Sequence, residues 1–248
     1  MPRLVYTLYI WLAFIPVMAL VTLILGASCL ATAPFIGPRR AGRFYAVPWS
    51  RIGLALSGIS VRVEGSHNIR PGQSYVVVAN HLSHIDIWVL YGYLGMDIRW
   101  VAKQEVRRIP VVGISCVALG HVFIDRSHPD RAIASLNAAK QQIVDGTSIL
   151  FFPEGTRSRD GMLHAFKKGA FRMATDLELP VLPVSLSGTR DALPPESLRF
   201  SPGQVVVNIL PSLTARDHSD EAVEQLLRTS HERIASATEQ RELTACPR

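Results

Sequence analysis

The stretch Tyr75–Asp86, YVVVANHLSHID, joins a run of apolar residues to a polar cluster. The run Tyr75–Ala79 is rich in valine and does not alternate with polar residues, which is typical of a β-strand buried on both faces of a parallel sheet. A second stretch, Ser148–Ser158 (SILFFPEGTRS), has the same plan. Because loops gather at the carboxyl edge of a parallel sheet, we expect the two polar clusters to lie close together.

Outward from these stretches, short runs rich in Val and Ile alternate with longer amphipathic segments. This alternation predicts an α/β fold with a mostly parallel sheet flanked by helices. The strands are predicted at Val61–Val63, Tyr75–Ala79, Ile98–Ala102, His121–Ile124, Ile149–Phe152, Val181–Leu186 and Val205–Leu210. The clearest helical patterns cover Asp130–Asp145, Lys168–Leu177 and about Ser219–Glu239.

Charge is distributed unevenly along the 248 residues, whose formal net charge is +6. The first 58 residues contain five Arg and no Lys, Asp or Glu, which leaves 21 basic and 20 acidic side chains in the remainder. A hydrophobic content of 48% excludes intrinsic disorder. The near neutrality of the remainder argues against a nucleic-acid-binding face. We therefore predict a membrane-anchoring helical segment over residues 1–58 and an α/β domain over residues 59–248.

The N-terminal segment is apolar enough to belong in lipid. Leu4–Pro38 is a run of 35 residues without a charge, whereas about 20 suffice to cross the hydrocarbon of a bilayer as a helix. A secretory signal is the competing interpretation, since Ala31–Ala33 (ATA) resembles a cleavage site, but the run is long for a signal core and Pro34 follows directly. We expect Pro16 to interrupt the helix, and Pro34, Gly37 and Pro38 to end it. One kinked span and a hairpin in a single leaflet both fit this pattern.

Four Arg between residues 39 and 51 follow the apolar run. Positive side chains next to a membrane segment favour the cytoplasmic face and anionic headgroups, so we expect the α/β domain on that face of the membrane. Aromatic and aliphatic residues accompany these Arg, which suggests a second, interfacial helix. Pro48 weakens this prediction, and a plain linker is the alternative.

His81 and Asp86 in the first cluster are candidates for acid–base chemistry. Five residues apart, they would point about 140° away from each other on an ideal helix, so they meet only if a turn separates them. Residues 83–86 (SHID) read as a capping box that opens a helix. Asp86 therefore either caps this helix alone or also orients the His81 imidazole, leaving its other nitrogen free to take a proton. His84 is expected on the surface of this helix or in the core.

The second cluster suits an anion. It has no nucleotide-binding G-x-x-x-x-G-K-[ST] pattern, but Gly155, Thr156 and Arg157 follow a strand, and backbone amides with a guanidinium bind phosphate oxygens well. Lys103 and Arg126 end other strands and could converge on the same anion. No G-x-S-x-G elbow occurs, so the reacting hydroxyl is expected to come from the substrate. The three Cys lack the spacing of a zinc site, and we predict no metal.

At these residues the chain resembles the 1-acylglycerol-3-phosphate (lysophosphatidic acid) acyltransferases of the glycerolipid acyltransferase family. The resemblance covers roughly residues 60–210, in four blocks: Asn80–Asp86 (NHLSHID), the region from Lys103 to Arg126, Phe152–Ser158 (FPEGTRS) and Leu179–Val184 (LPVLPV). The first and third blocks together are highly specific.

The resemblance implies that His81 is the general base and Asp86 its partner, and that Glu154, Gly155, Thr156 and Arg157 contact the phosphate-bearing acceptor. It implies transfer from acyl-CoA or acyl-carrier protein to lysophosphatidic acid, giving phosphatidic acid, with no metal or bound cofactor. The absence of a serine elbow and of a Cys near either cluster predicts that this transfer is direct, without an acyl-enzyme. The apolar stretches Trp88–Leu94 and Val111–Leu119 are candidates to line the path of the acyl chain, or for ordinary core packing.

Three alternatives remain open. The same fold could acylate another lyso-lipid, such as a lyso-ornithine lipid or a lysophospholipid. A catalytically silent lipid-binding protein at the membrane surface is a second possibility, which intact His81, Asp86 and Arg157 disfavour. A phospholipase or esterase is the third, which the missing serine elbow disfavours.

Overall fold

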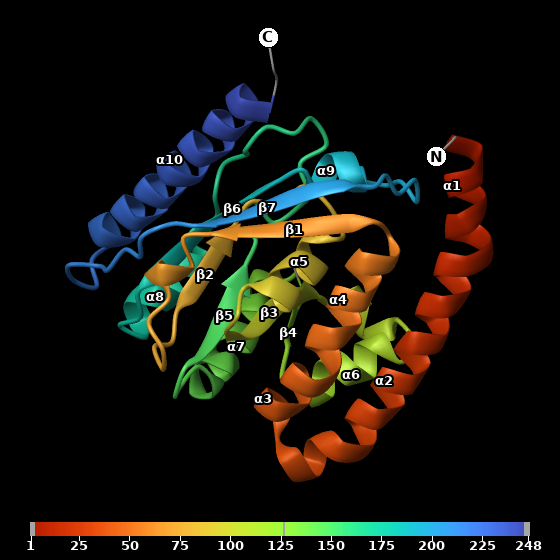
Figure 1. Ribbon diagram of the computed structural model, residues 1–248. Helices are drawn as coiled ribbons and strands as arrows, with labels where there is room; N and C mark the ends of the chain where they lie inside the picture. The colour runs from red at the N-terminus through yellow and green to blue at the C-terminus, as the bar shows by residue number, and fades with distance from the viewer. Residues whose placement is uncertain (1–2, 126, 246–248) are drawn as a thin grey trace.

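The computed structural model describes residues 3–125 and 127–245, which form an α/β domain and a long N-terminal helix (Figure 1). The domain is built on a seven-stranded sheet of order β1-β7-β6-β2-β5-β3-β4. The strands are β1 (Ile59–Glu64), β2 (Val76–Ala79), β3 (Asp97–Lys103), β4 (Val122–Ile124), β5 (Thr147–Phe151), β6 (Val181–Ser187) and β7 (Gly203–Ile209).

The sheet is mostly parallel, as predicted. Neighbours from β6 through β2, β5 and β3 to β4 all pair in parallel, whereas β7 is antiparallel to β6 and β1 is parallel to β7. Each predicted strand is present, with ends shifted by no more than two residues. β2 lies in the middle of the sheet and all four of its residues are buried. Burial on both faces explains why this strand is an unbroken apolar run.

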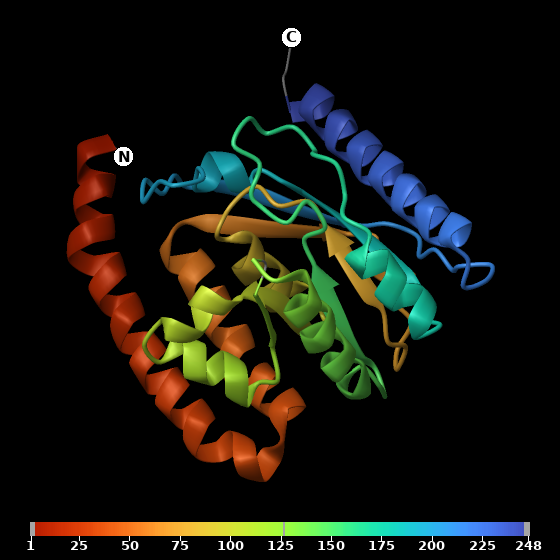
Figure 2. The same cartoon turned by 180° about the vertical axis from the view of Figure 1, so that it is seen from behind.

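Helices cover both faces of the sheet (Figures 1 and 2). On one face, Val77 and Ala79 of β2 share a core with α4 (Val47–Leu56) and α5 (Asp86–Tyr93). On the other face, Val76 and Val78 share a core with α7 (Pro129–Ala139), α8 (Gly169–Asp176) and α10 (Asp220–Ala245). The predicted helix from Asp130 is shorter than expected, because the chain tightens into a 3₁₀ turn at Lys140–Gln142. Two further helices are α6 (Val112–Ala118) and α9 (Thr189–Ala192).

The N-terminal helix is continuous, which corrects the expectation that Pro16 interrupts it. It comprises α1 (Arg3–Tyr9), a π-helical turn (Ile10–Phe14) and α2 (Ile15–Ile36). The wider π-turn directly precedes Pro16 and accommodates a residue that has no N–H to donate. Pro34 lies inside α2, and the helix ends at Ile36, where Gly37 has a φ of 80° that favours glycine.

The predicted second helix is also present. The chain turns back through α3 (Pro38–Ala41) and a second π-helical turn (Gly42–Ala46) into α4. Pro48 sits at the start of α4, directly after that π-turn, so the same device as at Pro16 keeps the helix continuous.

One face of the N-terminal helix packs on α4, and also on the α/β domain, where the rings of Phe14 and Phe200 lie 5.1 Å apart and α2 packs on α6. The Tyr6 hydroxyl donates to the carbonyl of Ser57 (2.8 Å), and further along the indole N–H of Trp49 donates to Thr22 Oγ1 (2.8 Å). The opposite face presents large apolar side chains to the surroundings: Leu4, Val5, Leu8, Trp11, Leu12, Val17, Leu20, Leu23, Ile24 and Phe35. By length and composition, Leu4–Ile36 could cross a membrane.

Candidate functional site

The Asp86 carboxylate organises the loop after β2. Its Oδ2 accepts the Nδ1–H of His81 at 2.8 Å and the backbone N–H groups of Leu82 at 2.7 Å and Ser83 at 2.8 Å. The carboxylate is fully buried. Asp86 therefore both caps the loop and orients the His81 imidazole, because a single carboxylate oxygen accepts all three hydrogen bonds. The contact fixes Nδ1 as the protonated nitrogen and leaves Nε2 free.

Ser83 supplies only half of the predicted capping box. Asp86 accepts its backbone N–H, but the Ser83 hydroxyl donates to the carbonyl of Leu193 at 2.6 Å. α5 accordingly begins at Asp86 and not at Ser83. The non-helical turn between His81 and Asp86 is what allows side chains five residues apart to meet.

The second cluster follows β5, which pairs in parallel with β2, so both clusters lie at one edge of the sheet as predicted. The buried Glu154 joins them: its Oε1 accepts the backbone N–H of His81 at 2.8 Å and its Oε2 that of His164 at 3.0 Å. Ser158 N–H donates to the His81 carbonyl at 2.8 Å. Burial raises the pKa of Glu154 despite these hydrogen bonds. Glu154 thus faces the His81 loop and is not part of the cavity wall described below.

Phe152 supports His81 in a way that the sequence did not indicate. Its ring stacks on the imidazole, with centroids 3.9 Å apart and an angle of 16° between the planes. The sequence pattern predicts only that Phe152 ends a buried strand. Nothing in the sequence around Phe152 or around His81 indicates that these two residues, 71 positions apart, are in contact. The stack and the Asp86 contact together restrict the imidazole to one orientation.

The predicted anion-binding residues largely converge. Gly155, Thr156 and Arg157 line a cavity next to His81, and Lys103 reaches the same cavity from the end of β3. Arg157 Nη1 is buried, and within residues 3–125 and 127–245 it has no hydrogen-bond partner. Arg126 lies outside the described residues. Lys167 is an addition: a Cβ on Gly155 would lie 2.9 Å from Lys167 Nζ, so this cation borders the loop.

His84 is part of the cavity wall and not a core residue. The pKa of His84 is lowered by burial and by the nearby charges of Arg157 and His81. Its imidazole is therefore neutral at pH 7, and part of its ring faces the same space as His81.

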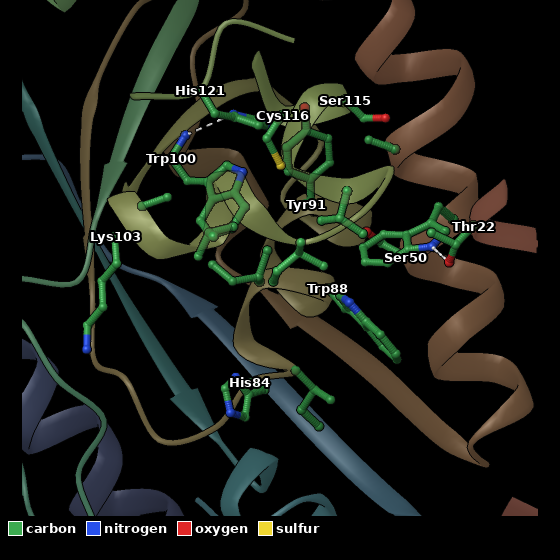
Figure 3. A pocket seen from close by; sticks show the side chains of 18 of the residues that line it. Thr22, Ser50, His84, Trp88, Tyr91, Trp100, Lys103, Ser115, Cys116 and His121 are labelled. Carbon is green, nitrogen blue, oxygen red and sulfur yellow. Dashed lines mark hydrogen bonds between the residues drawn. The ribbon is translucent and has the colours of Figure 1, made fainter. Parts of the chain in front are cut away.

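The cavity has a volume of about 540 Å³ and runs from the two polar clusters toward the N-terminal helix. Figure 3 shows Lys103 and His84 apart from Tyr91, Cys116 and His121, which lie deeper. The predicted stretches contribute Trp88, Tyr91, Val111, Val112, Ser115, Cys116 and Leu119 to its wall. The N-terminal segment contributes a set that the sequence did not single out: Thr22, Leu25, Gly26, Cys29, Tyr45, Ala46, Trp49 and Ser50.

No group of three or more His, Cys, Asp or Glu side chains is placed to hold a metal ion among the described residues. Cys29 and Cys116 are buried free thiols. Burial raises the pKa of Cys116 to about 12, so its thiol is protonated at physiological pH, as expected for an inert cysteine. His121 is also buried, and burial holds its pKa well below the ordinary value, so it is a neutral core histidine.

Comparison with known proteins gives one consistent result. The acyltransferase family profile matches residues 60–187. Human 1-acyl-sn-glycerol-3-phosphate acyltransferase alpha is 35% identical over 157 residues, which is 63% of this chain and 56% of that protein. The chain therefore matches little more than half the length of that relative. The 1-acyl-sn-glycerol-3-phosphate acyltransferase of Limnanthes douglasii is 32% identical over 194 residues, 78% of this chain and 68% of that protein.

A solved structure matches nearly the whole chain. The crystal structure of the 1-acyl-sn-glycerophosphate (LPA) acyltransferase PlsC from Thermotoga maritima superposes with a TM-score of 0.83 at 29% identity, covering 99% of each chain. The similarity therefore includes the N-terminal helices as well as the α/β domain.

Proposed function

The chain belongs to the acyltransferase family, and from this premise we propose that it transfers a fatty acyl group from an acyl thioester to the free hydroxyl of 1-acylglycerol 3-phosphate, giving phosphatidic acid. One observation carries the proposal: His81, held by Asp86, lines the same largely apolar cavity as the partly buried guanidinium of Arg157. A base, an anion-binding group and room for an alkyl chain are the three requirements of this reaction.

In the proposed mechanism His81 acts as general base. Nδ1 donates to Asp86, so Nε2 takes the proton of the acceptor hydroxyl as its oxygen attacks the thioester carbonyl carbon. The tetrahedral intermediate then collapses, the carbon–sulfur bond breaks, and the leaving thiolate receives the proton from the imidazolium. Asp86 stabilises the imidazolium that forms between the two steps. No enzyme nucleophile takes part, so the acyl group passes directly from donor to acceptor.

The acceptor phosphate is assigned to Arg157, the backbone of Gly155 and Thr156, and Lys103. A buried guanidinium nitrogen without a protein partner suits a phosphate oxygen, which would satisfy it with a charge-assisted hydrogen bond. Glu154 takes a different role from that of a substrate ligand. Because both of its oxygens hold backbone N–H groups, we propose that it is a positioning residue that keeps the His81 loop in register with the anion-binding loop.

The membrane anchor is proposed to be residues 1–58, held in one leaflet. The helix Arg3–Ile36 is about 50 Å long at 1.5 Å per residue, and it packs on the α/β domain through the Phe14–Phe200 ring pair and through α6. Crossing the bilayer would carry the polar surface of that domain into hydrocarbon, which is strongly unfavourable. A helix lying along one leaflet keeps its apolar face in lipid. The Arg cluster at residues 39–51 favours the cytoplasmic face.

The test is a transfer assay on the purified full-length protein in mixed micelles. Labelled acyl-CoA and acyl-carrier protein are each offered with lysophosphatidic acid, a lyso-ornithine lipid or a lysophosphatidylcholine. We expect phosphatidic acid from lysophosphatidic acid with at least one donor, and none from the variant His81→Ala. Preferred acylation of an acceptor without a phosphomonoester would overturn the substrate assignment. Activity that survives His81→Ala would overturn the mechanism.

A further inference from the structure

The outer face of α6 is apolar, although it lies on the surface of the domain. Its sequence, VGISCVA, contains no charged residue. Gly113 and Cys116 are buried, whereas Ile114 and Val117, one turn apart, are 52% and 45% exposed. Ile109, just before the helix, is 48% exposed and also lines the cavity, so it lies at the rim between the cavity and this face. A surface helix of an α/β domain normally carries polar residues on its outer face, so this face calls for a partner.

This face is continuous with the lipid-facing side of the N-terminal helix. α6 packs directly against α2, and Figure 2 shows the two helices side by side. The approach is close at Gly26, where an added Cβ would lie 2.2 Å from Cγ1 of Val111, the residue before α6. Leu23 and Ile24, next to this point on α2, are exposed. The apolar surface therefore extends from α2 across the junction onto α6.

Basic side chains lie in the turn that packs on α6. The 3₁₀ turn Gln104–Arg108 carries Arg107 and Arg108, both exposed, and one acidic residue, Glu105. Gly113 holds this turn against the helix, since a Cβ there would lie 2.2 Å from the Arg107 carbonyl oxygen. Apolar residues followed by guanidinium groups are the arrangement that suits the boundary between acyl chains and anionic headgroups.

We propose that Ile109, Ile114 and Val117, with Arg107 and Arg108, form a second lipid-contact surface, separate from the N-terminal anchor. The partner is the surface of an anionic bilayer. A patch of three apolar side chains is too small for a stable protein dimer, which buries about 800 Å² on each partner, whereas a membrane already lies against the adjoining face of α2. This inference rests on the membrane anchorage proposed above and not on the reaction.

The proposal gives α6 two sides with different roles. Val112, Cys116 and Leu119 line the cavity from inside, and Ile114 and Val117 would face lipid from outside. One helix would then separate the acyl-binding cavity from the bilayer. The anchor alone would leave the domain free to roll about the axis of the N-terminal helix, and a second contact on α6 removes that freedom.

The test measures the surroundings of single side chains on the full-length protein bound to vesicles. Cysteine is introduced as Ile114→Cys or Val117→Cys in a Cys246→Ser background, and labelled with an environment-sensitive fluorophore. Ile133→Cys is the matched control, because Ile133 is 56% exposed on α7, against the opposite face of the sheet. The background without an introduced cysteine checks that the buried Cys29 and Cys116 take no label.

With vesicles of phosphatidylcholine and phosphatidylglycerol, we expect probes at 114 and 117 to shift to the blue and to be quenched by nitroxide-labelled lipid. The probe at 133 should stay quenched by aqueous iodide. Probes at 114 and 117 that remain as open to iodide as the probe at 133 overturn the proposal. The proposal is also overturned if the probes at 114 and 117 are protected from iodide before lipid is added and this protection grows with protein concentration. That result would identify a second copy of the chain as the partner. None of these readings requires turnover, so an error in the proposed reaction would not alter them.

A kinetic measurement complements the probes. The double variant Ile114→Asn, Val117→Asn should raise the apparent KM for acceptor presented in vesicles several-fold, while kcat and KM in detergent micelles stay unchanged. Arg107→Gln should weaken the preference for anionic vesicles by about fivefold at low salt, the effect of one cation near a charged surface. Equal losses in micelles and vesicles would show a folding defect in place of a lost lipid contact, and would count against the proposal.

Discussion

The substitution Asp86→Asn separates the charge of the proposed catalytic pair from its geometry. Three N–H groups, from His81, Leu82 and Ser83, converge on Asp86 Oδ2 at 2.7–2.8 Å. An asparagine has to place its carbonyl oxygen at this point, because its NH₂ group would otherwise face three donors. The variant therefore keeps the turn and still accepts the Nδ1–H of His81, so the tautomer of the imidazole is preserved.

What the variant loses is a negative charge beside the imidazolium. A hydrogen bond to a charged partner contributes about 1.5–3 kcal/mol and a neutral one about 0.5–1.5 kcal/mol. The difference of about 1–2 kcal/mol corresponds to a decrease in kcat of roughly 5- to 30-fold. Full burial of Asp86 places the effect toward the upper end, since solvent does not screen the charge. A change of tautomer would instead cost roughly 10⁴-fold.

The assay compares initial rates in mixed micelles for the parent protein, Asp86→Asn and His81→Ala, together with their unfolding temperatures. Asp217→Asn is the matched control, because Asp217 also accepts a backbone N–H, that of Ser219 at 2.8 Å, but lies away from the cavity. The reasoning is refuted if Asp86→Asn is as inactive as His81→Ala while remaining folded. An unchanged kcat would refute it equally, since the charge would then play no part.

Four further predictions concern the site and the anchor. Arg157→Gln should raise the KM for lysophosphatidic acid roughly 10- to 150-fold and change the KM for the acyl donor little, because a charge-assisted hydrogen bond contributes about 1.5–3 kcal/mol. A two-substrate kinetic analysis measures both values, and the reverse pattern would reassign Arg157 to the donor. Leu23→Asp, on the exposed face of α2, should reduce flotation with anionic vesicles while circular dichroism is unchanged, because a charge in hydrocarbon costs about 2.5–3.5 kcal/mol; full flotation would argue that this face does not enter lipid. Burial raises the pKa of Cys116 to about 12, which keeps the thiolate scarce, so its alkylation in the native protein should be slow and should still rise with pH, without a plateau, from pH 7 to 9; a rate that levels off below pH 9 would show a lower pKa. Intact-mass spectrometry after incubation with acyl-CoA alone should likewise show no acyl adduct, and an adduct that added lyso-lipid removes would establish a ping-pong route.

The sheet was predictable because its strands are buried in a simple way. Val76–Ala79 of β2 and Thr147–Phe151 of β5 are buried throughout, and a strand enclosed on both faces is mostly apolar. The two polar residues of β5, Thr147 and Ser148, have hydrogen-bond partners. The shared edge of the two polar clusters followed from the same reasoning, since parallel neighbours end on the same side. Local periodicity therefore gave the fold and the neighbourhood of the site.

Contacts between distant residues were not predictable from local pattern. Phe152 stacks on His81, and Glu154 accepts the backbone N–H of His81. In the sequence both are residues at the end of a strand, and nothing in their local pattern indicates a contact with a residue more than 70 positions away. The proline residues misled for another reason. A proline such as Pro16 normally predicts a helix break. Here the π-turn that ends at Phe14 accommodates the missing N–H, and such a turn has no sequence pattern by which it could be predicted.

The packing of the N-terminal helix along the domain determines how the protein would search for its substrate. A domain joined to its anchor by a flexible linker sweeps through a volume of solution and meets the bilayer at changing angles. Here Tyr6, Thr22 and Thr32 hydrogen-bond the helix to residues 45–57. Phe14 and α2 also pack on Phe200 and α6 of the α/β domain, so the anchor and the sheet edge that carries His81 move as one piece. His81 would then remain at a constant height above the bilayer midplane, and encounters with lyso-lipid would be governed by diffusion in two dimensions and by the surface density of the acceptor.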